Sequence, residues 1–248
     1  MKNLNKISFT ILIFLLTCFS TVSGKTKYKK AKNSKQLIIL IHGIGDKPYS
    51  MWNIERTLYK KNYSVLNFDY ASTKSTMDSV VARLAREINN YETEYDSIYF
   101  VVHSLGSFVT RSYLMHHHNK KFANIVFIAP PSKGSIVAER FENFKLFKWL
   151  YGEAGQKLGK GHDDYWKQLA IPKIPFGIIA GGIGTKHGLN PLIPGDDDGT
   201  VGVQETIMEG YRDFIIIPGL HTSLLWQPNV MEQILFFIKN QKFRKTYQ

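Results

Sequence analysis

The sequence contains a single cysteine and has no acidic residue near either end. Cys18 is the only cysteine among the 248 residues, so no disulfide can form within the chain, and a small domain stapled by disulfides is excluded. The 20 Asp and Glu residues all lie between Asp46 and Glu232. The composition is 44% hydrophobic and 13% aromatic, which is enough for a buried core and excludes a disordered chain.

The formal net charge of +12 suggests at first a protein that binds nucleic acid or an anionic membrane. Twelve of the 32 basic residues, however, lie outside the span from Asp46 to Glu232, which holds 20 basic and 20 acidic residues. The folded body is therefore neutral. Because a domain that reads nucleic acid carries its basic residues on the fold itself, we expect no nucleic-acid partner.

The first 24 residues have the pattern of a secretory signal peptide. Two lysines precede an almost unbroken apolar run from Ile7 to Phe19, and small or compact residues follow at 22–24. This stretch is shorter than the roughly 20 residues that span a bilayer. We therefore expect cleavage after Gly24 and export to the periplasm or the medium. Two alternatives stay open, namely an uncleaved membrane anchor and lipidation of Cys18.

Basic segments without acidic residues lie at both ends of the remaining chain. Residues 25–35 contain six lysines, a pattern typical of a solvated, mobile arm, and residues 241–248 form a basic tail. The part between them, residues 36–240, is predicted to be one folded domain. If the protein meets an anionic membrane, these basic ends are expected to make the contact.

The folded body alternates short apolar runs with segments of helical periodicity. The runs are rich in β-branched and aromatic residues, as in strands that are buried on both faces: Leu37–Ile41, Ser64–Phe68, Ile98–Val102, Asn124–Ile128, Phe176–Ala180 and Phe214–Ile217. Helical spacing begins at Met77, after Ser75 as a candidate N-cap, and again after Pro228. This order predicts an α/β fold, a mostly parallel sheet of about six strands flanked by helices.

One interval between strands is much longer than the others. It follows Asn124–Ile128, and we assign residues 131–175 to an insertion. Its apolar side chains include Val137 and Phe141, and the stretch after them is rich in Gly and Lys. Two interpretations stay open, a helix packed on the body and a helical lid over a site.

The most specific sequence signal is the segment Val102-His103-Ser104-Leu105-Gly106 between a predicted strand and a predicted helix. A serine on such a tight turn presents its hydroxyl above the sheet, near N–H groups of the following helix that can stabilise an oxyanion. A serine that only caps a helix would give the same short pattern. Ser104 is the candidate nucleophile.

A serine hydroxyl needs a base, and the base needs an acid to orient it. His221 follows the last predicted strand and is the candidate base. The acidic turn Asp196-Asp197-Asp198 lies upstream, and composition alone does not select among its carboxylates. The loop His42-Gly43-Ile44-Gly45 follows the first predicted strand and can expose backbone N–H groups to a ligand. Serine, acid and histidine follow the order of a catalytic triad on a parallel sheet.

Two runs of similar residues raise the question of a metal site. The three aspartates lack the alternate spacing of an EF-hand calcium loop. The run His116-His117-His118 is predicted to end a helix, where consecutive side chains point about 100° apart. We interpret His42 and His103 as packing or hydrogen-bonding residues beside the site. No metal and no organic cofactor is expected.

These motifs together resemble the α/β-hydrolase superfamily, specifically its small bacterial lipase-like and esterase-like branch. The resemblance extends from about Leu37 to Phe237 and includes the H-G-[apolar]-G loop, the H-S-L-G turn, the D-D-G-T-V turn and the H-T turn. It implies Asp198 as the acid and the backbone N–H groups of Ile44 and Leu105 as the oxyanion hole. Val102 stands where the family usually has glycine. Because only a Lys-rich arm precedes Leu37, a trimmed version of the fold is expected.

The resemblance implies a serine hydrolase that cleaves carboxylic esters, with a small-molecule or lipid ester as substrate. Thioesterase, amidase and acyltransferase activities use the same residues and stay open. A different class also stays open, a catalytically silent protein of this fold that binds a partner at the cell envelope, because Val102 departs from the usual turn.

Overall fold

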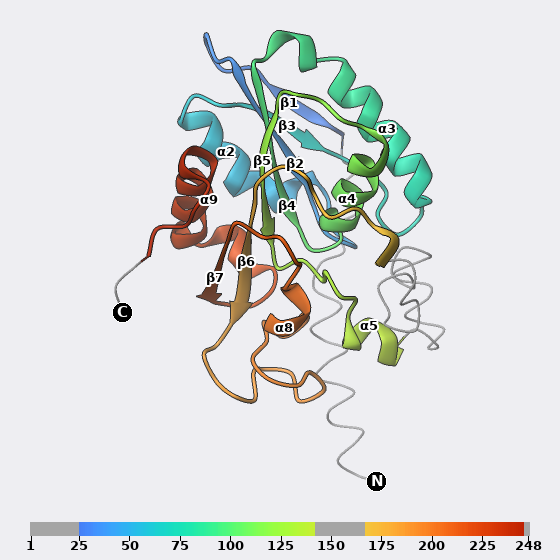
Figure 1. Ribbon diagram of the computed structural model, residues 1–248, viewed down its shortest axis with the longest axis vertical. Helices are drawn as coiled ribbons and strands as arrows, with labels where there is room; N and C mark the ends of the chain where they lie inside the picture. The colour runs from blue at the N-terminus through green and yellow to red at the C-terminus, as the bar shows by residue number, and fades with distance from the viewer. Residues whose placement is uncertain (1–24, 142–166, 246–248) are drawn as a thin grey trace.

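A computed structural model of the protein describes residues 25–141 and 167–245. It contains a seven-stranded sheet in the order β1-β3-β2-β4-β5-β6-β7 (Figure 1). All neighbouring strands are parallel except β1 and β3, which are antiparallel. The strands are β1 (Lys27–Lys29), β2 (Gln36–Ile41), β3 (Ser64–Phe68), β4 (Ser97–His103), β5 (Phe122–Ile128), β6 (Phe176–Gly182) and β7 (Asp213–Pro218). The α/β class is confirmed, and each of the six predicted strands is present with boundaries within two residues.

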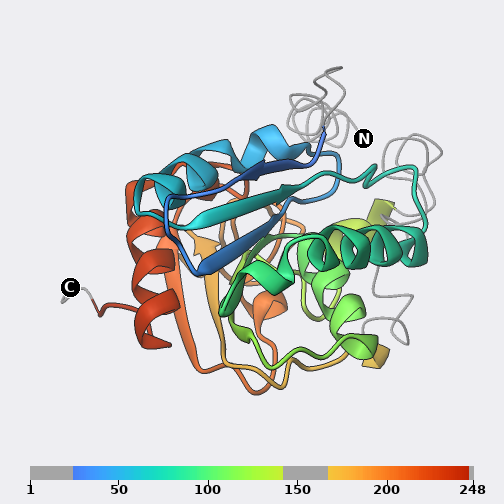
Figure 2. The same cartoon turned by 90° about the horizontal axis from the view of Figure 1, so that it is seen from above.

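Helices cover both faces of the sheet (Figure 2). Helices α2 (Trp52–Lys60) and α9 (Pro228–Asn240) pack on one face, and α3 (Met77–Asn89) and α4 (Gly106–His116) pack on the other. Strand β2 explains why both faces are apolar. Its side chains alternate between the two cores, with Leu37 and Ile39 on the α3 and α4 side and Ile38 and Leu40 on the α2 and α9 side.

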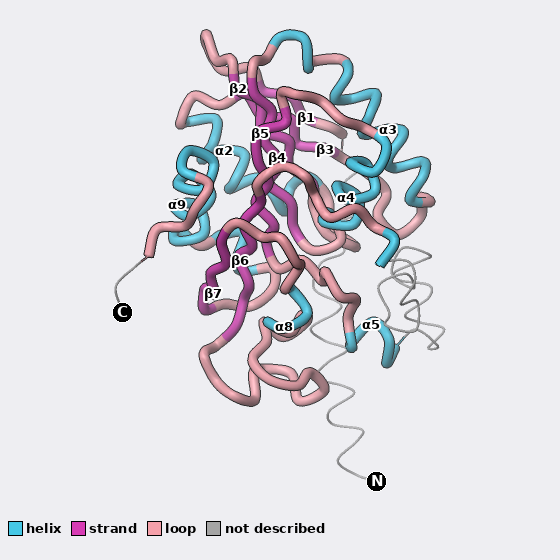
Figure 3. Tube along the Cα trace, viewed as in Figure 1, coloured by secondary structure: helices cyan, strands magenta, loops and turns pink. Residues whose placement is uncertain are grey.

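Short elements complete the fold between the strands. They are η1 (Pro48–Met51), η2 (Glu92–Glu94), α5 (Ile136–Phe141), α8 (Val203–Thr206) and η4 (Ser223–Trp226). The predicted N-cap of α3 was wrong by one residue, because the hydroxyl of Thr76, not that of Ser75, accepts a hydrogen bond from the Ser79 N–H at 3.4 Å. The long loops and α5 and α8 gather at one end of the sheet (Figure 3).

The prediction that residues 25–35 form a mobile arm was wrong for its central part. Lys27–Lys29 pair with β3 as an antiparallel edge strand. Tyr28 stacks on Tyr91 with ring centroids 4.0 Å apart, and its hydroxyl lies 2.5 Å from that of Tyr95. Because Tyr28 is anchored by two aromatic side chains and Lys27–Lys29 pair with the edge of β3, this segment belongs to the fold.

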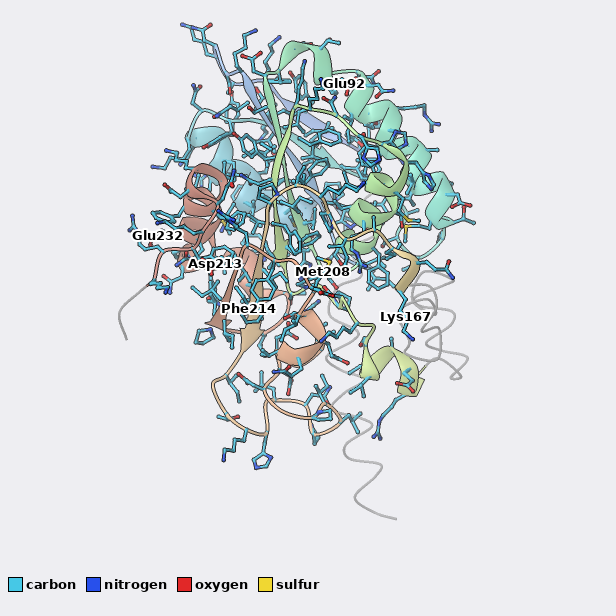
Figure 4. The ribbon with its side chains drawn as sticks, viewed as in Figure 1. Glu92, Lys167, Met208, Asp213, Phe214 and Glu232 are labelled. Atoms are coloured by element: carbon cyan, nitrogen blue, oxygen red, sulfur yellow. The ribbon has the colours of Figure 1, made fainter. Side chains whose placement is uncertain are left out.

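The basic tail is also packed as far as Arg244. Phe243 is buried against Phe237 of α9, and its N–H donates to the carboxylate of Asp213 at 2.7 Å. The Arg244 N–H donates to the side chain of Gln233 at 2.8 Å. In Figure 4, Asp213 lies beside α9 at the start of β7.

Part of the predicted insertion lies outside the described residues. Of residues 131–175, the structure describes 131–141, where α5 buries Val137 and Ala138, and 167–175. The buried guanidinium of Arg111 in α4 joins these two pieces by donating to the carbonyl oxygens of Ser132 and Leu169. The rest of the predicted insertion, residues 142–166, and the predicted signal peptide, residues 1–24, lie outside the described residues. Among the described helices, none is long and apolar enough to cross a membrane.

Candidate active site

Ser104 occupies a sharp turn between the end of β4 and the start of α4. Its φ angle is +51°, which is uncommon for a residue other than glycine and marks backbone strain. The turn is held by two backbone hydrogen bonds. Ser104 N–H donates to the Ile128 carbonyl at 3.0 Å, and Ser107 N–H donates to the Ser104 carbonyl at 2.9 Å. The strand-to-helix turn predicted from the sequence is therefore present.

Gly106 makes this turn possible, because β2 passes directly beneath it. A Cβ atom at Gly106 would lie 2.5 Å from the Ile41 carbonyl oxygen and 3.0 Å from that of His42. Val102, by contrast, is completely buried in the core under α3 and α4. The side chain of Val102, which stands where the family usually has glycine, is thus accommodated in the core. The position at which two backbone segments approach closely is Gly106, two residues after the serine.

We expect Gly106→Ala to destabilise the protein by about 1–3 kcal/mol, because the added methyl group forces the start of α4 away from β2. Helix propensity alone predicts the opposite sign, since alanine favours a helix over glycine. Chemical denaturation measures the change in the free energy of unfolding. An unchanged or larger free energy would contradict the close packing of Gly106 on Ile41.

His221 and Asp198 form a hydrogen-bonded pair near the end of the sheet where the strands terminate. The Nδ1 atom of His221 donates to Oδ2 of Asp198 at 2.7 Å, and the His221 backbone N–H donates to the Asp198 carbonyl at 2.9 Å. The other carboxylate oxygen accepts the N–H groups of Thr200 at 3.0 Å and Val201 at 2.8 Å. The carboxylate is fully buried. This pair places the hydrogen of neutral His221 on Nδ1 and leaves Nε2 as a proton acceptor.

The surroundings of His221 set its basicity. Burial lowers the pKa of the imidazole, but the negative charge and hydrogen bond of Asp198, together with the charge of Asp46, outweigh burial and raise the pKa above its usual value. A base with a raised pKa attracts a proton strongly once a neighbouring hydroxyl offers one.

His103, immediately before Ser104, packs against His221 and holds its loop. The two rings are 4.7 Å apart between centroids, and Nε2 of His103 donates to the His221 carbonyl oxygen at 3.2 Å. Its Nδ1 lies 3.8 Å from a carboxylate oxygen of Asp46. Burial lowers the pKa of His103. The ring thus acts as a hydrogen-bonding residue, as the sequence analysis interpreted it.

His42 serves the neighbouring loop in a similar way. Its Nδ1 atom donates to the Gly43 carbonyl oxygen at 2.9 Å, and its ring stacks on Tyr70 with centroids 4.3 Å apart. The Tyr70 hydroxyl donates to the His42 carbonyl at 2.7 Å. Burial lowers the pKa of His42 as well. His42 therefore fixes the loop after β2 and is also a packing residue.

Two backbone N–H groups next to the serine are available to a ligand. Among the residues that the structure describes, neither the Ile44 N–H nor the Leu105 N–H has a hydrogen-bond partner. The loop that carries Ile44 lies against the serine, because a Cβ atom at Gly43 would be 3.1 Å from the Cβ of Ser104. Donors placed in this way can stabilise negative charge that develops beside the serine.

The structure therefore brings the predicted residues to one end of the sheet. The packing of the acidic turn against the end of β6 was not predicted from the sequence. Gly181 and Gly182 end β6, and a Cβ atom at either would clash with Asp198 or Asp196. The carboxylates of Asp196 and Asp197 accept backbone N–H groups of the surrounding loop, such as Ile183 and Leu189. In the sequence, the feature that could have indicated this packing was the pair of glycines, Gly181 and Gly182, at the end of an apolar run.

A metal site has no support in the part of the chain that the structure describes. No group of three or more His, Cys, Asp or Glu side chains there is placed to hold an ion. Of the three consecutive histidines, His116 is the last residue of α4 and the other two follow it. His116 and His118 are exposed, and His117 stacks on Tyr113 with ring centroids 4.4 Å apart.

Solved structures similar to this chain include a lipase and two esterases. The mature lipase of Bacillus licheniformis has a TM-score of 0.67 at 18% identity, covering 89% of this chain and 99% of that one. A metagenomic carboxyl esterase has a TM-score of 0.62 at 15% identity, covering 84% and 71%. An esterase of Pyrococcus furiosus has a TM-score of 0.53 at 17% identity, covering 89% and 91%. No curated protein matches the sequence.

A family model adds evidence from the sequence itself. The model described as the alpha/beta hydrolase fold matches residues 36–170, which is more than half of the chain. The matched segment includes the loop after β2 and the Ser104 turn. With the sheet order, the serine turn and this match in agreement, the chain belongs to the alpha/beta hydrolase family.

Proposed function

We propose that the protein is a serine hydrolase of carboxylic esters, with Ser104 as nucleophile, His221 as general base and Asp198 as the orienting acid. The observation that carries the proposal is the 2.7 Å hydrogen bond between His221 and Asp198, because it leaves Nε2 of His221 free to accept a proton. His103, the residue before Ser104, packs against this imidazole, and Ser104 itself is held at positive φ. The named activities of the similar structures, a lipase and two esterases, support an ester as the bond that is cleaved.

The reaction follows from these atoms. As the hydroxyl oxygen of Ser104 forms a bond to the ester carbonyl carbon, its proton passes to Nε2 of His221, and Asp198 stabilises the resulting imidazolium. The carbonyl oxygen becomes an oxyanion that accepts hydrogen bonds from the N–H groups of Ile44 and Leu105. Collapse breaks the bond to the alcohol oxygen, which takes the proton from His221. Water then repeats these steps on the acyl-serine and releases the acid.

A fluorophosphonate probe and a series of p-nitrophenyl esters of increasing acyl length test this proposal on the full chain. We expect the probe to label Ser104, as read by peptide mass spectrometry, and at least one ester of the series to be hydrolysed. Thioester and amide analogues with the preferred acyl group then establish the class of bond. If the folded protein neither takes the probe nor cleaves any ester, the proposal fails and the catalytically silent alternative is supported.

A further inference from the structure

A row of exposed aromatic side chains lies along the outer side of α2 and extends to η4. Tyr49, Trp52, Tyr59 and Trp226 are 63%, 36%, 42% and 43% exposed. Positions 52, 56 and 59 are three or four residues apart in α2 and therefore share one side of this helix, and Tyr49 precedes them in η1. The Trp226 ring lies 6.2 Å from Trp52 and 6.3 Å from Tyr49 between centroids. We call these four residues and Arg56 the aromatic–basic face.

Cations are interleaved with these rings. The guanidinium of Arg56 lies 5.4 Å from the centroid of the Trp52 ring, and the ammonium of Lys29 in β1 lies 5.7 Å from that of Tyr59. Lys60 and Lys61 are exposed at the end of α2. Positive charge therefore accompanies the exposed aromatic surface along its whole length.

Negative charge is almost absent from the same surface. Glu55 is the only acidic residue between positions 47 and 62, and its side chain is 2% exposed, held by Lys29 at 2.6 Å and by the Asn67 amide at 2.6 Å. Glu232 lies on the neighbouring helix α9 (Figure 4). It is exposed and forms an ion pair with Arg244. The ammonium of Lys29 is thus neutralised by Glu55, whereas the guanidinium of Arg56 has no acidic partner among the described residues. The face presents aromatic rings and this cation to a partner.

The aromatic–basic face is continuous with the loops that build the candidate active site. η1, which contains Tyr49, follows the loop of Ile44 after three residues. η4, which ends at Trp226, begins two residues after His221. The side-chain amide of Asn53 in α2 donates to the Trp226 carbonyl at 3.4 Å and joins the two segments. Whatever binds this face lies next to the loops of the site.

We propose that the aromatic–basic face docks on an anionic lipid surface. Tryptophan and tyrosine rings have an apolar body and a polar edge, which suits them to the boundary between head groups and acyl chains. Lysine and arginine beside them are attracted to anionic head groups. A second copy of this chain fits less well, because a symmetric contact would place cation against cation. A membrane contact is thus proposed for the folded face, separately from the contact expected at the basic ends.

Vesicle flotation of the full chain tests the proposal. Vesicles that contain phosphatidylglycerol and vesicles of pure phosphatidylcholine are compared for the unaltered protein, the double variant Trp52→Ser with Trp226→Ser, and Arg56→Gln. We expect the double variant to lower binding to the anionic vesicles by about tenfold or more, through loss of the interfacial rings. Arg56→Gln is expected to lower it about fivefold, the contribution of one cation near an anionic surface. Added salt is expected to weaken binding of the unaltered protein.

Tyr211→Ser is the matched control, because Tyr211 is 43% exposed and lies before the start of β7, away from α2. It is expected to bind vesicles as the unaltered protein does. The N-terminal apolar segment is present in every variant, so differences among them report the face alone. Thermal unfolding and hydrolysis of a water-soluble ester check that each variant is folded, and they keep a failure of docking distinct from a failure of the hydrolase proposal.

Three results would overturn the docking proposal. One is equal vesicle binding by the double variant and the unaltered protein, and another is an equal loss with Tyr211→Ser. The third is a dimer of the unaltered protein that the double variant dissociates while lipid binding is unchanged, which would assign the face to a second copy.

Discussion

Replacing Ser104 with alanine is expected to lower kcat/KM for a p-nitrophenyl ester by about 10⁴-fold or more, since the proposed acyl intermediate forms on its hydroxyl oxygen. The loss is expected in kcat, with KM changed little, because the serine oxygen contributes mainly to the transition state. The fold is expected to persist, since alanine lacks only the hydroxyl and the φ angle of +51° at this position is set by the surrounding turn. Steady-state kinetics with circular dichroism of both proteins measures the effect.

Ser107 provides a matched control for the Ser104 variant. It lies three residues later in α4, is buried, and its hydroxyl has no hydrogen-bond partner among the described residues. Ser107→Ala therefore removes the same kind of atom, a serine hydroxyl oxygen, from the first turn of the helix that follows Ser104. It breaks no hydrogen bond and is expected to retain most of the activity. If Ser104→Ala were as active as Ser107→Ala, the assignment of the nucleophile would be wrong.

The regular part of the fold could be predicted because its strands are buried on both faces. In β2 and β4 nearly every residue is apolar, so the runs stand out from their neighbours in the sequence. β1 could not be found in the same way. It has three residues, two of which are lysines, and it exists because β3 offers a free edge and Tyr28 packs beside Tyr91. These are tertiary contacts, and the pattern of charges in the sequence does not indicate them.

The candidate site residues that directly follow a strand could be predicted from the sequence. Ser104 comes directly after β4, and His221 follows β7 by three residues. Asp198 is different, because it lies sixteen residues beyond β6. It reaches His221 only because the loop folds back onto Gly181 at the end of that strand. Composition left three aspartates equivalent, and only the motif resemblance separated them.

The contacts that His103 and Asp46 make around the candidate site could not be predicted from the sequence, because they depend on the fold. His103 was interpreted as a hydrogen-bonding residue, but its acceptor, the carbonyl of His221, is 118 residues away in the chain. Asp46 had no signal beyond its place after Gly45. It lies near His103 because the loop after β2 packs on the Ser104 turn. Such contacts join loops from different strands, and their spacing in the sequence carries no information about them.

Replacing Asp198 with asparagine is expected to lower the plateau of kcat/KM by about 10⁴-fold, because an amide can hold His221 in the wrong tautomer. The acid limb of the pH profile, which is the range over which kcat/KM falls as the pH decreases, is expected to move as well. In the unaltered protein the pKa of His221 is raised above its ordinary value, so activity is expected to fall as the pH decreases through a value higher than that of an ordinary histidine. Without the Asp198 charge, burial is left to lower that pKa, so the limb is expected at lower pH. A profile of kcat/KM between about pH 5 and pH 9 measures both effects.

Asp196→Asn is the control that separates this charge effect from damage to the turn. The Asp196 carboxylate accepts the N–H groups of Ile183 and Gly184 and has no hydrogen bond to His221. The amide oxygen of an asparagine there can still accept the N–H groups of Ile183 and Asp197, whereas the hydrogen bond from the Gly184 N–H is lost. Because none of these bonds involves His221, both the plateau and the acid limb are expected to stay close to those of the unaltered protein. Equal profiles for the two variants would mean that Asp198 acts by holding the loop and does not orient the imidazole. A limb that moves only in Asp198→Asn would assign the raised basicity of His221 to that carboxylate, with the charge of Asp46 as the smaller remaining contribution.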